Sequence, residues 1–225
     1  MKPSVLLVVL LAVVFAPQAN AQGTHDNAPG TRPHNEALTA YEEGRYGDAL
    51  RKYRESARWA DKVSQFNLGV MHYLGQGTEP DLATAWAWFE LSAERDYPEM
   101  VKAAKGAWAA LDDDGRARAL TILETLRPEF GDAVALERTA KYMDRERKGT
   151  MTGSRVGFVG NLRVRSRNMP EGMDVDGEDF YAAERWDFET IVELEGKVFD
   201  NLARGYVDVG ELETLEDEAA DEVEP

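Results

Sequence analysis

The sequence predicts a mainly α-helical protein, built as a short right-handed α-solenoid of paired antiparallel helices with a small C-terminal α+β module and an acidic disordered tail. Three observations predict this fold: apolar residues recur at helical spacing in the N-terminal half, the pattern repeats after 36 residues, and Gly, Ser and Thr accumulate from position 149. The predicted divisions are a signal peptide at 1–21, a disordered linker at 22–35, a helical repeat domain at 36–148, the module at 149–210 and the tail at 211–225.

The first 21 residues have the composition of an export signal. Lys2 supplies a positive start, residues 5–16 are twelve consecutive apolar residues, and Ala19 and Ala21 are the small residues that a signal peptidase recognises. Twelve helical residues at about 1.5 Å each cannot cross a hydrocarbon core of about 30 Å. We therefore expect cleavage after Ala21 and a periplasmic protein, with secretion as the alternative.

Composition excludes several classes of protein. The chain has no cysteine, which excludes disulfides, thiolate metal sites and a lipid anchor on an N-terminal thiol. The net charge of −16 argues against general nucleic-acid binding. His25 and His34 lie in the polar segment expected to be a linker, and they lack neighbouring ligands that would indicate a metal site.

Four helices are expected before position 98. The first uses Ala37, Leu38, Ala40 and Tyr41, and the break at 44–47 precedes a second helix that Asp48 is expected to cap. The third runs from about 63 to 74 and ends at Gly-Gln-Gly, residues 75–77. Pro80 and Asp81 suit the first turn of the fourth helix, because proline needs no amide partner there and a carboxylate favours the positive end of the helix dipole.

Self-comparison at a shift of 36 residues aligns the second and fourth helices. The aligned pairs are Ala49 with Ala85, Leu50 with Trp86, Tyr53 with Phe89, Ser56 with Ser92, and Ala57 with Ala93. Small residues let two helices approach, and the aromatic residue between them fills the space between helix pairs. A fixed period of this length is typical of solenoids.

The second unit carries a family resemblance on a specific set of residues. They are Asn67-Leu68-Gly69-Val70-Met71, Gly75-x-Gly77, Asp81, Ala85, Trp88-Phe89 and Ser92-Ala93. With these residues the unit resembles the Sel-one-like repeat, a relative of the tetratricopeptide repeat, and the preceding unit resembles a plain tetratricopeptide repeat. His72, Thr78 and Asp96 depart from the family's usual Tyr, Val and Gly.

The rest of the chain predicts three more helices and a module of different character. The helices are expected at 98–111, 116–126 and 132–147, the first two as a degenerate third unit after a turn at 112–115. In the module, Val156, Phe158, Leu162 and Val164 alternate as in a strand, 168–177 is a loop, 180–202 has helical spacing, and 206–209 suggests a last strand.

No arrangement of residues predicts catalysis, a cofactor or a metal, so we expect a protein that is not an enzyme. His72 lies at a helical packing position, where a buried histidine is the simpler interpretation than a general base. Asp174, Asp176 and Asp179 form an acidic loop, but its glycine spacing differs from that of a calcium loop. A divergent enzyme centred on this loop stays as a minor alternative.

The resemblance implies that a partner protein binds on the face formed by the first helix of each pair. Carried over through Leu68-Gly69, this face holds Phe66, Val70, Tyr73 and Leu74 in the second unit and Leu38 and Tyr41 in the first. Aromatic and aliphatic side chains in a groove dominate binding energy at protein interfaces. The alternative is that the same residues only pack against neighbouring helices.

The charge is unevenly distributed along the chain. Residues 138–167 hold nine Lys or Arg against two acids, and residues 205–225 hold nine acids and no base. A weak contact with an anionic surface is one interpretation of the basic segment, through Arg145, Arg147, Lys148, Arg163 and Arg165. Screening of this segment by the acidic tail, or simple solvation, is the other.

We therefore predict an exported repeat protein that acts as a protein–protein interaction scaffold or adaptor in the cell envelope, without a cofactor. The alternative function is an immunity or inhibitor protein that neutralises a toxic enzyme in the periplasm, for which an acidic surface would suit a basic target.

Overall fold

The structure, a computed structural model, describes residues 28–150, 163–164, 175–176 and 186–203. The helices of this part are α2 (Thr31–Glu42), α3 (Tyr46–Ala57), α4 (Lys62–Leu74), α5 (Leu82–Ser92), the short 3-10 helix η2 (Ala93–Arg95), α6 (Pro98–Ala110), α7 (Asp113–Phe130), α8 (Asp132–Thr150) and α10 (Phe188–Ala203). Strands β1 (Arg163–Val164) and β2 (Val175–Asp176) form an antiparallel pair, Arg163 opposite Asp176 and Val164 opposite Val175.

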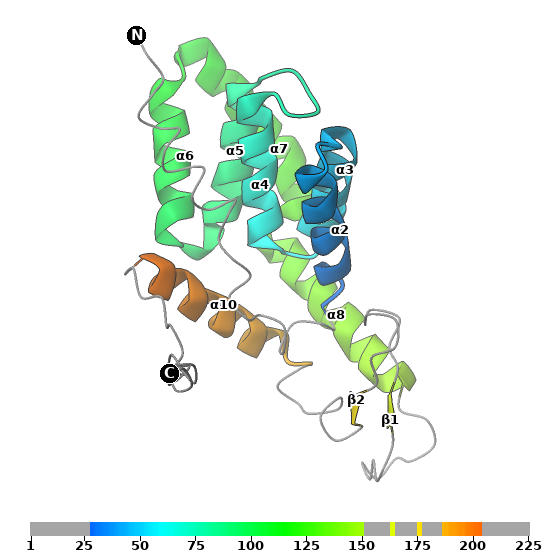
Figure 1. Cartoon of the computed structure of the whole chain (residues 1–225). Helices are drawn as coiled ribbons and strands as arrows, with labels where there is room; N and C mark the ends of the chain where they lie inside the picture. The colour runs from blue at the N-terminus through cyan, green and yellow to red at the C-terminus, as the bar shows by residue number, and fades with distance from the viewer. Residues whose placement is uncertain (1–27, 151–162, 165–174, 177–185, 204–225) are drawn as a thin grey trace, which may run out of the picture.

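The helices of the first two units pack as antiparallel pairs, α2 with α3 and α4 with α5. Helix α3 also packs against α4, which joins the two pairs into one array (Figure 1). In the third unit, both α6 and α7 pack against α5. This arrangement confirms the mainly α-helical solenoid of paired helices, with α4 and α5 at its centre.

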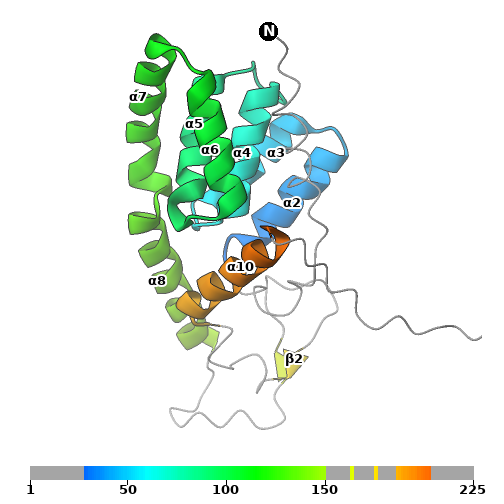
Figure 2. The same ribbon diagram turned by 90° about the vertical axis from the view of Figure 1, so that its left-hand side faces the viewer.

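Helices α7 and α8 continue end to end along one side of the array (Figure 2). Gly131 separates them, where a Cβ would lie only 2.8 Å from the carbonyl oxygen of Arg127. The turn expected at 112–115 is shorter than predicted, because the Asp112 side chain caps α7 by accepting a hydrogen bond from the Gly115 amide at 2.8 Å.

Two aspartates fix the starts of the central helices. Asp61 caps α4 by accepting from the amides of Val63 and Ser64, and Asp81 caps α5 in the same way. The prediction that Asp48 caps the second helix is wrong. Helix α3 begins at Tyr46, and Asp48 lies in its first turn.

The Gly-x-Gly loop between α4 and α5 requires glycine for two separate reasons. Gly75 ends α4 with φ at 71° and Gly77 has φ at 76°, a region that residues with a Cβ rarely adopt. A Cβ on Gly77 would also lie 2.8 Å from the carbonyl oxygen of Tyr46 in the preceding unit. The loop therefore sets both the turn and the spacing between units.

The small and aromatic residues that recur after 36 positions form the centre of the core. Ala49 and Ala85 are completely buried, and Tyr53 and Phe89 are 1 % and 0 % exposed. Gly69 of α4 lets α5 approach so closely that a Cβ there would be 2.5 Å from the Phe89 ring. The predicted roles of small and aromatic residues are confirmed.

The structure corrects the predicted linker at 22–35 in its last residues. Helix α2 already begins at Thr31, because Pro33 is buried and His34 contacts the cap residue Asp61. A polar composition concealed these contacts, since their partners lie about 30 positions later in the sequence. His25 lies outside the described residues.

The C-terminal α+β module is not supported. Within 149–210 the described residues form the end of α8, the two-residue pairing of β1 with β2, and α10, and α10 packs against α6 and α8 rather than building a layer on the strands. Strands of two residues bury too little surface to hold a separate module. The residues outside the described part include Val156, Phe158, Leu162, 206–209, and the segments predicted to be a signal peptide (1–21) and an acidic tail (211–225).

In the part of the chain that the structure describes, no helix combines the length and the apolar character needed to span a bilayer.

Candidate functional site

The predicted partner-binding face is only partly at the surface. Phe66 and Val70 are 1 % and 2 % exposed, so in the free protein neither side chain is open to a partner, contrary to the prediction. The physical reason is the position of α4, which lies between the first pair and α5. The Phe66 ring packs against Phe89 with ring centroids 5.3 Å apart. At these two positions, the face that the family resemblance assigns to partner binding points into the core instead.

The remaining four residues of that face reach solvent to different degrees. Leu38, Tyr41 and Tyr73 are half-buried, and both tyrosines pack against the edge of the main core. Leu74, near the end of α4, is 37 % exposed and is one of the exposed large apolar side chains of the described residues. An accessible apolar and aromatic surface therefore lies at the end of α4 and on α2.

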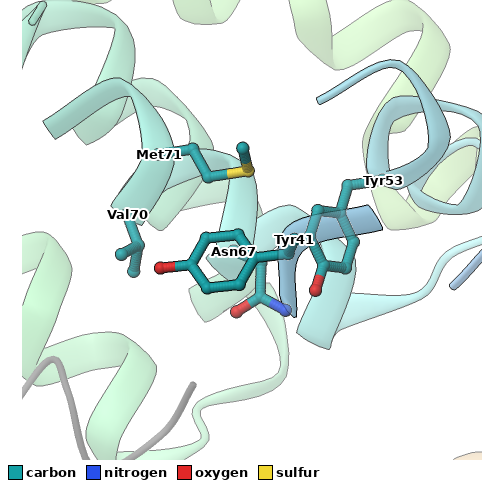
Figure 3. A pocket seen from close by; sticks show the side chains of 5 residues that line it. All are labelled: Tyr41, Tyr53, Asn67, Val70 and Met71. Carbon is teal, nitrogen blue, oxygen red and sulfur yellow. The ribbon is translucent and has the colours of Figure 1, made fainter. Parts of the chain in front are cut away.

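A narrow crevice lies between the first two units. Figure 3 shows its lining, which consists of Tyr41, Tyr53, Asn67, Val70 and Met71. These side chains leave no space between them for a sphere of the size of a water molecule. Tyr41 is the least buried of the five residues, so its ring forms the outer wall of the crevice.

Asn67 gives this crevice a polar group with unused binding capacity. Its Oδ1 atom is buried and has no hydrogen-bond partner among the described residues. A buried acceptor without a donor costs about 1–3 kcal/mol. An amide oxygen of this kind accepts a hydrogen bond from any N–H or O–H that reaches it, which includes a peptide backbone amide.

Tyr41 connects the crevice to the Gly-x-Gly loop. Its hydroxyl donates to Oε1 of Gln76 at 3.0 Å, and its ring meets that of Tyr46 edge-on at 5.3 Å between centroids. Both contacts are near the surface. The tyrosine therefore has a defined position in the free protein, held by one hydrogen bond and one ring contact that a partner can replace.

A second cluster surrounds the Asp61 carboxylate, and one of its members, His34, lies in the segment predicted to be a linker. Nδ1 of His34 lies 3.0 Å from Oδ2 of Asp61 and 3.0 Å from Oγ of Ser64. The hydroxyls of Ser56 and Ser64 donate to the same Oδ2 atom at 2.7 and 2.9 Å. This set differs from a catalytic triad, because aspartate and serine share one ring nitrogen and the base therefore cannot relay a proton between them.

His34 and Asp61 stabilise each other's charged form. Burial alone would lower the pKa of His34, but the charge of Asp61 and the hydrogen bond to it outweigh burial, so the pKa is raised. Burial would raise the pKa of Asp61, but His34 and the hydrogen bonds from Ser56 and Ser64 hold it well below its usual range. The pair fastens α2 to the start of α4.

A third cluster is centred on Lys62, whose side chain is completely buried. Its Nζ atom contacts Oε2 of Glu94 and Oδ1 of Asp132, both at 2.9 Å, and donates to the carbonyl oxygen of Leu91 at 2.7 Å. Sequence reasoning missed this lysine. The available signal was its position in the first turn of a helix, where a positive charge opposes the helix dipole and needs compensation.

The other residues considered for chemistry take structural positions. His72 is half-buried, and burial lowers its pKa, which agrees with a packing role. In the described ranges, no group of three or more His, Asp or Glu side chains is arranged to hold a metal ion. The acidic loop at 174–179 is described only at Val175 and Asp176.

The basic end of α8 is largely occupied by contacts within the chain. Lys148 pairs with Asp144 at 2.6 Å, and the Arg145 guanidinium lies 5.5 Å from the centre of the Tyr142 ring. The predicted contact of this segment with an anionic surface has no support. Arg147 belongs to the same helix, Arg163 belongs to β1, and Arg165 lies outside the described residues.

Paired antiparallel helices, a repeated small-aromatic-small code and a Gly-x-Gly turn together define a helical repeat protein of the tetratricopeptide-like class. More specifically, residues 62–97 match the family model of the Sel1 repeat, which covers α4, α5 and the η2 turn. This confirms the resemblance in the second unit. Sel1 repeats are typically protein–protein interaction scaffolds.

Comparison with solved structures finds one match. A protective antigen present in uropathogenic Escherichia coli strains, with a crystal structure displaying an SLR fold, is 19 % identical with a TM-score of 0.42, over 59 % of this chain and 27 % of the antigen chain. This chain thus matches about a quarter of the length of that structure. No curated protein matches the sequence.

Proposed function

We propose that this protein is an exported interaction scaffold of the cell envelope, and that it binds a partner protein across α2 and the end of α4. The observation that carries the proposal is the buried, unpartnered Asn67 oxygen in a crevice whose outermost lining residue is the half-buried Tyr41. Protein interfaces combine a few apolar anchors with satisfied hydrogen bonds. Leu38, Tyr41, Tyr73 and Leu74 are the proposed anchors.

The partner of this surface is an extended or helical peptide segment with an apolar side chain. Movement of the Tyr41 ring, held by Gln76 and Tyr46, would open the crevice to such a side chain. A backbone N–H next to that side chain would then satisfy Oδ1 of Asn67. Satisfying a buried acceptor that is unpaired in the free protein adds to the binding energy, because its cost is already present before binding.

Site-specific photocrosslinking in cells tests this surface. A photoreactive amino acid replaces Leu74 in one variant and Leu120, which is 47 % exposed on α7, in a matched control. We expect a discrete crosslinked product from position 74 and none from position 120. The product should disappear when Tyr41→Ala and Tyr73→Ala are added, provided circular dichroism shows that this variant remains folded. Equal products at both positions, or a product that survives the double substitution, would contradict the proposal.

Export is proposed from the sequence of residues 1–21 alone. If it is correct, the protein isolated from the periplasmic fraction begins at Gln22, and the culture medium contains little of it. A cytoplasmic full-length chain that begins at Met1 would contradict export while leaving the interaction surface untested by this measurement. Replacing Leu7 and Leu10 with arginine should interrupt the apolar run and keep the chain inside the cell.

A further inference from the structure

Arg54 of α3 is an exposed cation that has no carboxylate partner in the part of the chain that the structure describes. Its guanidinium lies over two buried aromatic rings, 5.0 Å from the centre of Phe130 and 5.8 Å from the centre of Trp88. Contacts with rings position the guanidinium but do not neutralise its charge. Arg54 therefore stays able to bind a carboxylate through two N–H donors.

Two more arginines meet Arg54 at the end of α7. Nε of Arg58 lies 2.8 Å from Oε1 of Glu129. Nη1 of Arg138, from α8, donates to the carbonyl oxygen of Glu129 at 2.9 Å and to that of Arg58 at 2.6 Å. Since Arg54 lies over the next residue, Phe130, three guanidinium groups gather around the last two residues of α7. We call Arg54, Arg58 and Arg138 the arginine cluster.

The arginine cluster has more positive charge than its surroundings compensate. Among the described residues, Glu129 is the carboxylate that contacts it, so three cations face one anion. The acids of α3 contact other cations: Glu55 pairs with Lys52 at 3.3 Å, and Asp48 pairs with two other arginines. The cluster is also open to solvent, since the Arg58 side chain is 52 % exposed. In a chain with a net charge of −16, this local excess indicates a site for an anionic group.

The complementary charge is present in the same chain. Residues 205–225, which we call the acidic segment, hold nine acids and no Lys or Arg. Three of these acids are consecutive, at 216–218, so a short stretch of the segment can offer several carboxylates at once. Carboxylates are the groups that a guanidinium fork binds with two parallel hydrogen bonds.

The acidic segment begins within reach of the arginine cluster. Glu195 of α10 and the carbonyl oxygen of Ala60 both contact the Arg95 guanidinium, and Ala60 follows Arg58 by two residues. From Glu195 to the end of α10 the helix rises about 12 Å, which places its end within about 35 Å of Arg58. Residues 204–225 span up to about 70 Å when extended, so the chain can reach the cluster even along a curved path.

We propose that the arginine cluster is the docking site of the chain's own acidic segment. Carboxylates of residues 205–225 provide the partner that Arg54 lacks and share Arg58 and Arg138 with Glu129. The site differs from the screening expected from the sequence, which concerned residues 138–167, because two of the three arginines belong to α3. It lies on α3, α7 and α8, whereas the anchors proposed above belong to α2 and α4, so the inference is independent of the proposed function.

Docking within one chain needs little intrinsic affinity. A short tether gives an effective concentration of about a millimolar, so contacts with a dissociation constant of about a millimolar keep the segment docked in about half of the molecules. Because these contacts are exposed ion pairs, salt weakens them. The docked segment would exclude other anionic groups from the cluster, and an acidic partner could bind there only by displacing it.

A spin label in the acidic segment tests the proposal on the full chain. Since the chain has no cysteine, Ala219→Cys provides a single attachment site for a nitroxide. In proton–nitrogen NMR spectra at low salt, we expect the amide signals of residues 54–58 and 138 to lose about half of their intensity or more, relative to the reduced label. Residues 102–106 of α6 should keep their intensity. In about 0.5 M sodium chloride, where the Debye length is about 4 Å, the loss should disappear.

Matched substitutions separate docking at the cluster from general attraction between opposite charges. Arg54→Gln with Arg58→Gln should abolish the loss of intensity. Lys102→Gln with Lys105→Gln removes the same charge from the exposed side of α6 and should leave the loss unchanged. Neutralising residues 216–218 with Gln and Asn leaves the folded array unaltered and should also abolish the loss, which keeps the test valid if the arginine variant does not fold.

Three results would overturn the proposal. The first is a spectrum in which residues 54–58 keep their intensity at low salt. The second is an equal effect of the arginine and lysine pairs of substitutions, or a loss that survives neutralisation of residues 216–218. The third comes from mixing spin-labelled chains with isotope-labelled chains that have no spin label. A loss of intensity in this mixture as large as that within one chain would assign the site to the acidic segment of a second copy.

Discussion

At the scale of single residues, the buried charges are the part that sequence reasoning could not find. The positions of Ala49, Ala85 and Gly69 follow from the repeat because small residues are needed wherever two helices approach. Lys62 and His34 depend instead on partners 27 to 70 positions away, and only the folded chain brings these together. The spacing of apolar residues shows which side of a helix is buried, but it does not show which charged side chains will find a partner of opposite charge there.

Replacing Lys62 by methionine should be strongly destabilising. The substitution fills similar space but leaves Glu94 and Asp132 with less compensation for their charge. Removing one partner of a buried ion pair costs about 3–5 kcal/mol, and the remaining contact of Asp132 with Arg95 favours the lower end. Urea unfolding gives the value, with Lys102→Met on the surface of α6 as the control. Equal effects of the two substitutions would disprove the role of Lys62.

Asp96 replaces the glycine usual in the family, and its backbone shows why glycine is preferred. Its φ is 58°, in the left-handed region, at the end of η2. We expect Asp96→Gly to be more stable than Asp96→Ala by about 1 kcal/mol, because alanine has neither the freedom of glycine nor a polar side chain that tolerates this region. Thermal unfolding of the two variants checks this, and an alanine variant as stable as the glycine variant would exclude backbone strain as the cause.

At the scale of elements, the sequence predicted the existence of helices better than their ends. Helix α6 agrees with its predicted range within one residue, because Pro98 and the apolar stripe mark it clearly. Helix α7 extends past Leu126 to Phe130, which is buried against Trp88 of α5. The prediction of the binding face was wrong at Phe66 for the same reason. The exposure of a side chain depends on contacts between helices, and the pattern of a single helix does not show which helices pack against it.

The close approach of α4 and α5 can be tested by filling it. Gly69→Ala would place a methyl group 2.5 Å from the completely buried Phe89 ring, so we expect a loss of about 1–3 kcal/mol in the free energy of unfolding. Adding Phe89→Leu should cost less in the Gly69→Ala background than in the unmodified chain, because leucine makes room for the methyl group. The double-mutant cycle in urea measures this coupling, and strict additivity would show that the two positions do not meet.

At the scale of the whole molecule, two features stabilise the fold. One is the apolar core of the repeats, and the other is a set of ion pairs between segments that are distant in the sequence. The core joins α2 to α7 and follows from the repeat. His34 with Asp61, Lys62 with Asp132, and Arg95 with Glu195 fasten α2, α8 and α10 to it. These fastenings explain why the first helix starts earlier than its composition suggested and why the C-terminal helix packs against the array without a module of its own.

The pH dependence of global stability follows from these fastenings. The raised pKa of His34 contributes stability that is complete below its ordinary value of 6.5 and is lost as the pH rises through the raised value. The lowered pKa of Asp61 acts at the other end, where stability falls only as acid protonates this carboxylate below its ordinary value of 3.8. We therefore expect maximal stability in the mildly acidic range and a decline from about pH 5.5 to pH 8.

Urea unfolding at several pH values should separate the buried groups from the overall negative charge. The net charge of −16 also destabilises the folded chain as acids ionise, but salt screens that repulsion much more than it screens buried pairs. The decline should therefore persist in about 0.5 M sodium chloride, where the Debye length is only about 4 Å. His34→Gln should reduce the decline, and Arg32→Gln, on the exposed side of α2, should leave it unchanged. A decline that salt abolishes, or that His34→Gln leaves intact, would assign the pH dependence to general charge repulsion instead.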